Sequence, residues 1–300
     1  MLPTARCINT NDNGLTKGID MNPGSTTYDH NVVERCVHVL NHRPAGILTD
    51  IDGTVSPMAR TPGEAVVAPV AKDALERLRN HVELVGVVTG RSALVAEALV
   101  EITNIVYVGN HGMEWIERGE LHHHASAAAW SDTVRSALIE IADIAARDRF
   151  DDGLIVEDKG LSGSIHFRLA PDVERTHTLL TTTAVAVGDR TGLRITEGRM
   201  VIEIRPPVEI SKGTAVRDLV RDRGLKGIVF LGDDVTDVDA FKAVRELRDS
   251  DGIAGLRIGV TSAETPQSVL DESDVTVPGV EACAMLLAAV ADRLESADEH

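Results

Sequence analysis

Aspartate residues gather at two places in the sequence, each directly after a short apolar run. The stretch ILTDIDGTVSP carries Asp50 and Asp52, and the stretch VFLGDDVTD carries Asp233, Asp234 and Asp237. Two like charges about 4 Å apart repel by roughly 4 kcal/mol at an effective dielectric near 20. A hard cation with oxygen ligands relieves such repulsion, and an all-oxygen set suits Mg²⁺. If the fold brings the two stretches together, these residue types predict a magnesium site.

Two further polar residues stand at the ends of predicted elements. Thr89 ends the apolar run VGVVT, and Lys212 opens a helical stretch. A cation and an ammonium group neutralise phosphate oxygens while one free carboxylate oxygen attacks phosphorus. A second carboxylate two residues on can act as acid toward the leaving group and then as base toward water. The set therefore predicts phosphoryl transfer through an aspartyl-phosphate, which divides one very slow reaction into two steps.

Other phosphate and cation motifs fit less well. A calcium-binding EF-hand loop needs glycine at its sixth position, but Gly53 stands at the fourth, and DDVTDVDAF has no glycine. The chain contains neither G-x-x-x-x-G-K-[ST] nor G-x-G-x-x-G, so a nucleotide-cradling loop has no support.

The elements that must position these residues alternate along most of the chain. We expect helices at 31–40, 68–81, 91–102, 212–223, 236–247 and from about 280. We expect strands at 45–50, 82–90, 104–110, 227–234, 256–260 and 274–277. Near-continuous Val, Ile and Leu strands between helices favour a Rossmann-like, doubly wound parallel α/β sheet. Ligands bind at the carboxyl ends of such strands, so we expect all the residues above at one edge.

The pattern changes between about residues 114 and 206. We expect one long helix over 126–150, a second helix over 172–190, and strands at 154–160, 162–170, 193–199 and 200–207. Several of these strands alternate apolar and polar residues, as in an antiparallel sheet with one wet face. We therefore predict a catalytic core of residues 31–113 and 207–300, with an inserted α+β cap domain of residues 114–206.

The composition of the chain limits its binding partners and the cellular compartment in which we expect it. The 300 residues include 47 acidic and 30 basic ones, a formal net charge of −17, which disfavours nucleic acid and anionic membranes as partners. The three cysteines are widely spaced, which favours a reducing cytoplasm over a disulfide framework. No apolar run approaches a membrane span, and residues 1–30 lack a signal-peptide pattern, so we expect a flexible tail there, with Met21 as an alternative start. A cytoplasmic monomer acting on a small molecule is the expectation.

Four motifs resemble those of the haloacid dehalogenase superfamily: DIDGT at 50–54, VVTGRS at 87–92, Lys212, and GDDVTD at 232–237. The stretches VGNHGMEW (108–115), VEDKGLSGSIHFR (156–168) and GRMVIEIRPPVEISKGTAV (198–216) further resemble the trehalose-phosphatase family, over about residues 32–290. The resemblance implies a Mg²⁺-dependent phosphatase that releases trehalose from trehalose 6-phosphate, with a mobile cap that closes over the sugar.

The resemblance also implies roles for single residues. Asp50 would be the nucleophile and Asp52 the general acid and base, while Thr89 and Lys212 would hold the phosphoryl group. Mg²⁺ would be held by Asp50, the backbone carbonyl of Asp52, and Asp233, with support from Asp234 and Asp237. The implied substrate-binding residues are Gly90, Arg91, His111, Gly112, Glu157, Lys159 and Glu203. Independently of the family, Glu157 and Lys159 lie two apart on a predicted strand and so share a face.

Two positions depart from the family's usual pattern. Ile51 stands where tyrosine or phenylalanine is usual, and Val238 replaces a glutamate. Ile51 is expected only to pack. Val238 bears on the contacts around the cation and on the choice of substrate.

Several alternatives stay open. His111 lines the cleft or is satisfied within its own loop, and the cap charges form either a sugar clamp or an ordinary cross-strand cluster. The histidines at 122–124 favour a solvated connection over a metal site, and Trp115 and Trp130 favour packing over a sugar platform. As functions, a phosphatase for another sugar phosphate (sucrose phosphate or a glycosylglycerate phosphate) and a catalytically silent sugar-phosphate sensor remain as alternatives.

Overall fold

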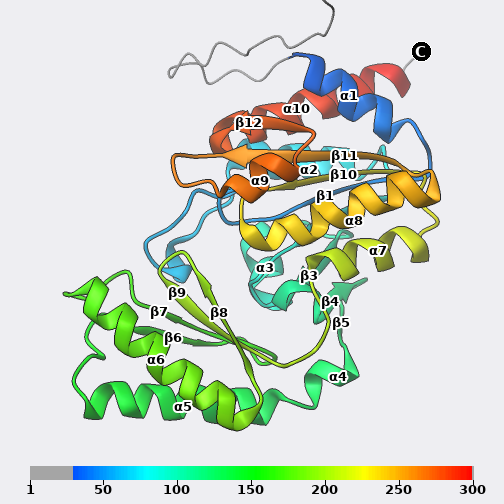
Figure 1. Cartoon of the computed structure of the whole chain (residues 1–300). Helices are drawn as coiled ribbons and strands as arrows, with labels where there is room; N and C mark the ends of the chain where they lie inside the picture. The colour runs from blue at the N-terminus through cyan, green and yellow to red at the C-terminus, as the bar shows by residue number, and fades with distance from the viewer. Residues whose placement is uncertain (1–29, 299–300) are drawn as a thin grey trace, which may run out of the picture.

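The computed structural model describes residues 30–298, so the expected N-terminal tail and the alternative start at Met21 lie outside the described residues. The described chain forms two sheets, an eight-stranded core sheet and a four-stranded small sheet (Figure 1). Among these residues, no helix has the length and apolar character needed to cross a membrane.

The core sheet has the strand order β12-β11-β10-β1-β2-β3-β4-β5. Its strands are β1 Ala45–Thr49, β2 Leu84–Val88, β3 Val106–Gly109, β4 Glu114–Glu117, β5 Glu120–His123, β10 Gly227–Gly232, β11 Ala254–Thr261 and β12 Val275–Pro278. All neighbours from β12 to β3 pair in parallel, while β4 and β5 are antiparallel. Every residue of β1, β2 and β10 is buried, as expected for strands covered on both faces.

Helices cover both faces of the core sheet (Figure 1). One face packs against α1 His30–Leu40, α2 Pro69–Leu78, α3 Ala93–Val100 and α10 Gly279–Asp298. The other packs against α7 Lys212–Asp222, α8 Val235–Asp251 and α9 Gln267–Glu272. The chain places successive strands on both sides of β1, so the strand order reverses there, which is where a doubly wound sheet binds its ligands. The predicted α/β fold class is confirmed.

The small sheet lies in the inserted segment and has the strand order β6-β7-β9-β8, all antiparallel. Its strands are β6 Ile155–Asp158, β7 Gly163–His166, β8 Arg194–Gly198 and β9 Val201–Arg205. Helices α5 Ser131–Arg147 and α6 Val173–Thr191 pack on one face around a separate apolar cluster. The opposite face carries a cross-strand row of polar residues, Glu157, Ser164, Glu203 and Thr196.

The long helix expected over 126–150 is wrong in one respect, because two helices occupy this stretch. Short α4 Ala125–Ala128 ends before Trp130, and α5 begins after it. The Trp130 N–H donates to the Ala127 carbonyl three residues back, which tightens the turn, and its ring packs against the apolar cluster of the insert.

The stretch directly after β3 also differs from expectation. Residues 114–123 form the hairpin β4–β5, which continues the core sheet beside β3. Its turn places Arg118 at φ 52° and Gly119 at φ 77°, and Arg-Gly is not the Asn-Gly or Asp-Gly pair that marks such a turn in a sequence. We therefore propose that the cap begins after His123 rather than at residue 114.

Candidate active site

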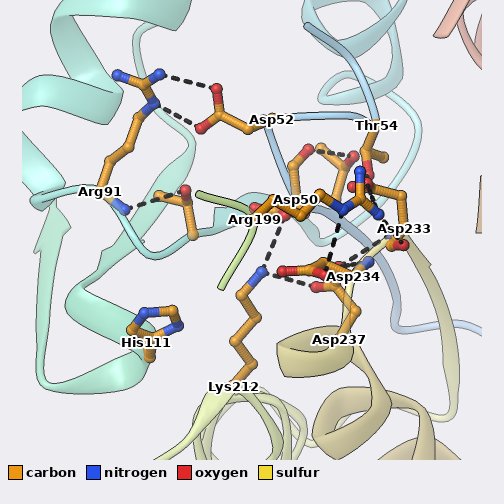
Figure 2. Close-up of polar contacts among 12 residues, drawn as sticks. Asp50, Asp52, Thr54, Arg91, His111, Arg199, Lys212, Asp233, Asp234 and Asp237 are labelled. Carbon is orange, nitrogen blue, oxygen red and sulfur yellow. Dashed lines mark hydrogen bonds and ion pairs between the residues drawn. The ribbon is translucent and has the colours of Figure 1, made fainter. Parts of the chain in front are cut away.

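Three aspartates converge at the carboxyl ends of β1 and β10 (Figure 2). Asp50 directly follows β1, Asp233 directly follows β10, and Asp237 lies in the first turn of α8. One carboxylate oxygen from each lies within 4.8 Å of the others, and all three residues are buried. The parallel pairing of β1 with β10 aligns the two strand ends, which is why residues 183 positions apart meet, as the sequence predicted.

Lys212 binds two of these aspartates from the start of α7. Its side chain is 1% exposed, and its Nζ lies 3.0 Å from Asp50 Oδ2 and donates to Asp237 Oδ1 at 2.7 Å. Asp237 Oδ2 accepts the backbone N–H groups of Asp233 and Asp234, each at 3.0 Å. Both oxygens of Asp237 thus already have protein donors, so this residue positions Lys212 and the loop after β10.

Asp50 is buried with too little positive charge around it. Its Oδ1 has no hydrogen-bond partner among the described residues. Burial raises its pKa well above the ordinary value, and the neighbouring carboxylates Asp237, Asp233 and Asp52 raise it further, outweighing Lys212. A divalent cation beside this carboxylate would supply the missing charge, so the donor set fits Mg²⁺.

Asp233 has a similar environment on the other side of the cluster. Burial first, and then Asp237, raise its pKa to about 7, although Arg199 and Thr54 act against them. Its Oδ1 accepts a hydrogen bond from the Thr54 hydroxyl at 2.9 Å. Gly53 permits this approach: it has φ 86°, and a Cβ there would lie 2.1 Å from Asp233 Oδ2. The glycine of DIDGT is therefore required by both its backbone angle and its neighbour.

Asp52 points toward Arg91 (Figure 2). Arg91 Nε lies 2.6 Å from Asp52 Oδ2 and its Nη2 lies 2.8 Å from Oδ1, a bidentate pair. A third bond runs from Arg91 Nη1 to the Pro62 carbonyl at 3.0 Å. Arg91, expected to bind substrate, here holds the side chain of Asp52 at the rim of the site.

Thr89 and His111 lie on the β2–β3 side of the site. Thr89 is buried, and its hydroxyl accepts the Arg91 backbone N–H at 3.3 Å. His111 is also buried, and its Nε2 lies 3.1 Å from Glu203 Oε2. A carboxylate only accepts hydrogen bonds, so Nε2 carries the hydrogen and Nδ1, which has no partner within residues 30–298, is an acceptor. Burial lowers the pKa of His111, and Glu203 offsets this only in part.

Gly90 and Gly112, both predicted to bind substrate, allow neighbouring loops of the site to approach each other closely. Gly90 faces the His111 ring, because a Cβ on it would lie 2.6 Å from Cε1. Gly112 has φ 109°, and a Cβ there would lie 2.8 Å from the Ser211 carbonyl at the start of α7. Both glycines therefore bring the loops of the site together, and a side chain at either position would separate them.

A cavity of about 680 Å³ joins this cluster to the polar face of the small sheet. Lys159 Nζ donates to the Gly90 carbonyl at 3.0 Å and lies 3.6 Å from Glu203 Oε1. Glu157 Oε2 pairs with His166 at 3.3 Å. Burial alone would raise the pKa of Glu203, but His111 and Lys159 hold it well below its ordinary value. All the predicted cap residues therefore line the same cavity as Asp50.

The buried side-chain amide of Asn110 forms hydrogen bonds between the insert and the core, and it was not predicted from the sequence. Asn110 Nδ2 donates to Glu114 Oε1 at 2.9 Å and to the Lys159 carbonyl at 3.0 Å, and its Oδ1 accepts from the Ser162 hydroxyl. Asn110 and His111 both have positive φ, at 49° and 58°. The available signal was the position of Asn110 directly before His111 in GNHGME.

Arg199 is a second residue of the site that was not predicted from the sequence. It lies in the β8–β9 turn, and its Nη2 lies 3.3 Å from Asp233 Oδ2 and 3.2 Å from the Asp233 carbonyl. Its Nε lies 3.8 Å from Asp234 Oδ1. This contact joins the insert to the aspartate cluster across 34 residues of sequence, and no local pattern marks it.

The remaining sequence expectations concern residues away from the cluster. Ile51 is fully buried in the core and Val238 packs in the apolar cluster between the core sheet and α8. His122 and His124 both contact the Trp115 ring, with centroids 5.3 and 5.1 Å apart. Within residues 30–298, the geometry for holding a metal is met by the three aspartates and not by the histidine run.

Comparisons with known proteins show which family the chain resembles. The family described as Trehalose-phosphatase matches residues 48–273. A trehalose-phosphate phosphatase of Mycobacterium marinum is 35% identical over 209 residues, which cover 67% of this chain and 52% of that protein. A Mycobacterium tuberculosis protein named as an uncharacterized glycosyl hydrolase is 31% identical over 223 residues, covering 71% of this chain and 16% of that protein. The chain thus spans only 16% to 52% of the length of these curated relatives.

The fold is similar to that of a solved structure as well. The C-terminal domain of a C. albicans trehalose-6-phosphate phosphatase superposes with a TM-score of 0.71, over 89% of this chain and 97% of that chain. The sequences are 19% identical, so this likeness concerns the fold alone.

Proposed function

The chain belongs to the trehalose-phosphatase family of the haloacid dehalogenase superfamily, and from that premise we propose that it hydrolyses trehalose 6-phosphate to trehalose and phosphate. The reaction would depend on Mg²⁺ and pass through a phosphate ester of Asp50. The observation that carries this proposal is the buried Asp50 carboxylate: its Oδ2 lies beside Lys212, its Oδ1 has no partner among the described residues, and the Asp233 carboxylate lies close by.

The cation site is supported by the charge of the cluster. Asp50, the backbone carbonyl of Asp52, and Asp233 would hold Mg²⁺. When bound, the ion would neutralise both these carboxylates and the oxygens of the phosphate. Lys212 adds one fixed positive charge on Asp50, and Asp237 keeps it there. The net charge of −17 makes such local positive charge necessary for an anionic substrate.

The chain's own residues would then carry the two steps. Asp50 Oδ1 bonds to phosphorus as the bond from phosphorus to the sugar oxygen breaks, and Asp52 gives a proton to that oxygen. Asp52 next takes a proton from water, which attacks phosphorus and releases Asp50. Because Arg91 holds Asp52 at the rim in this conformation, Asp52 has to part from Arg91 to reach the leaving group.

The sugar would occupy the cavity beneath the small sheet. Glu203, Lys159 and Glu157 line it with charged groups that can donate to or accept from hydroxyls. His111 adds the acceptor Nδ1 on the core side, which no described residue occupies as a donor. These contacts support a sugar phosphate as the substrate class. The choice of trehalose 6-phosphate rests on the family.

The direct test is release of inorganic phosphate from trehalose 6-phosphate by the purified full chain. We expect release with Mg²⁺, loss of activity with EDTA, and recovery when Mg²⁺ is restored. Asp50→Asn serves as the control for contaminating phosphatases. No release with Mg²⁺, together with binding of the intact substrate, would favour a sensor instead.

A further inference from the structure

We propose that Arg199 competes with the divalent cation for Asp233, so that cation binding and this contact between the insert and the core exclude each other. The inference rests on the cation site of the proposed function. It makes Arg199 a positioning residue, which sets where the β8–β9 turn lies according to whether the cation is bound.

Asp233 is only 4% exposed, and its two carboxylate oxygens have different partners. Its Oδ1 accepts a hydrogen bond from Thr54, which belongs to the same loop as Asp50. Its Oδ2 lies 3.3 Å from Arg199 Nη2. Thr54 and Asp233 both belong to the core, so their bond does not depend on the insert. A cation that takes Oδ2 therefore needs the oxygen that Arg199 occupies.

The Arg199 side chain is held in place by the loop after β10. This side chain is 18% exposed, and its ion pairs within residues 30–298 are those with Asp233 and Asp234. A further bond to the Asp233 carbonyl, at 3.2 Å, fixes the guanidinium over the loop after β10 (Figure 2). The turn is also held by two bonds from the segment after β7: the Arg168 side chain donates to the Arg199 carbonyl at 3.4 Å, and the Phe167 backbone N–H donates to the Met200 carbonyl at 3.0 Å.

A guanidinium and a divalent cation on the same carboxylate repel each other strongly at such distances. Linkage makes the effect reciprocal: the contact weakens cation binding by the same factor by which the cation weakens the contact. Removal of the guanidinium should therefore tighten cation binding, and addition of the cation should free the β8–β9 turn.

Titration calorimetry of the full chain with MgCl₂, without substrate, tests the first consequence. We expect Arg199→Gln to bind Mg²⁺ on the order of tenfold more tightly than wild type, within the range usual for coupled sites. Arg168→Gln is the matched control, since Arg168 also lines the cavity and contacts Arg199 but, in the part of the chain that the structure describes, has no ion pair with the aspartates. Its Kd should stay within about twofold of wild type. Equal or weaker binding by Arg199→Gln, or no binding by either protein, would overturn the proposal.

Hydrogen exchange tests the reciprocal consequence. Saturating Mg²⁺ should speed amide exchange at residues 196–202 in wild type and leave the already released turn of Arg199→Gln unchanged. Exchange in wild type that is unaffected or slowed by Mg²⁺ would contradict the competition. Neither measurement uses a sugar phosphate. If no sugar phosphate is hydrolysed while Arg199→Gln still binds Mg²⁺ more tightly, the proposed function fails and this inference stands.

Discussion

The two carboxylate oxygens of Asp50 have different surroundings. Oδ2 lies 3.0 Å from the Lys212 ammonium, whereas Oδ1 is buried without a partner among the described residues. A buried acceptor without a donor costs free energy, and burial together with the neighbouring carboxylates keeps the pKa of Asp50 high. The site thus stores unfavourable electrostatics at the oxygen that we expect to attack phosphorus, as is common where a residue is kept for chemistry.

Asp50→Asn tests this residue directly. We expect kcat for phosphate release to fall by about 10⁴-fold or more, because an amide cannot form the phosphate ester. The thermal unfolding temperature should stay equal or rise, since one like charge leaves a buried cluster. Activity near that of wild type would refute the aspartyl-phosphate route, whereas a large loss of stability would show that Asp50 also supports the fold.

At the scale of elements, the short helical turn Asn110–Gly112 lies between β3 and β4 of the core and contacts the insert. Asn110 adopts a left-handed backbone and uses its side chain to hold the Lys159 carbonyl and the Glu114 carboxylate. A left-handed non-glycine backbone costs free energy and persists where surrounding contacts enforce it. We interpret this turn as the element that positions Lys159 in the cavity.

Asn110→Asp should disturb that positioning. A carboxylate cannot donate to the Lys159 carbonyl and repels Glu114, so we expect KM for the sugar phosphate to rise about tenfold while kcat changes less. Asn104→Asp is the control, since Asn104 also has positive φ, at 62°, but is exposed. Steady-state kinetics of both variants checks this, and a fall in kcat at unchanged KM would argue against a role through Lys159.

Asp274 directly precedes β12 and binds two arginines. Asp274 binds Arg257 through bonds of 2.9 and 2.7 Å and Arg248 through one of 3.0 Å. Burial alone would raise its pKa, but these arginines lower it from 3.8 to about 2. A lowered pKa contributes stability that is present above the ordinary value and is lost as the pH falls through the lowered one.

Asp274→Asn should therefore lower the free energy of unfolding near neutral pH, by about 1 to 3 kcal/mol for hydrogen bonds to charged groups. The difference from wild type should shrink as the pH falls from about 4 toward 2. Urea unfolding at a series of pH values measures it. A difference that is independent of pH over this range would assign the loss to packing rather than to the ion pairs.

At the scale of the whole molecule, the sequence predicts the features that follow from local patterns of apolar residues. The buried runs of β1 and β10 are continuous and apolar, so their ends, and with them Asp50 and Asp233, could be placed at one edge. The contacts of Asn110 and Arg199 join segments 49 and 34 residues apart. They depend on how the insert packs over the core, and this packing cannot be predicted from the hydrophobic periodicity of any short stretch of sequence.

The cavity between the two sheets should decide substrate preference. Glu203→Ala should raise KM for the sugar phosphate about tenfold and also lower kcat, because binding energy remote from phosphorus helps to orient it. Glu209→Ala is the control, since Glu209 is exposed and forms an ion pair with Arg194 at the surface. An unchanged kcat/KM in Glu203→Ala would remove this residue from the site.

A substrate panel tests most directly whether the chain is a metal-dependent phosphatase for one disaccharide phosphate. The purified chain with Mg²⁺ would be assayed for phosphate release from trehalose 6-phosphate, sucrose 6-phosphate, a glucosylglycerate phosphate and glucose 6-phosphate. We predict that kcat/KM for trehalose 6-phosphate exceeds the others by at least about tenfold, the effect of a few well-placed hydroxyl contacts. Equal values across the panel, or a higher value for another sugar phosphate, would contradict it.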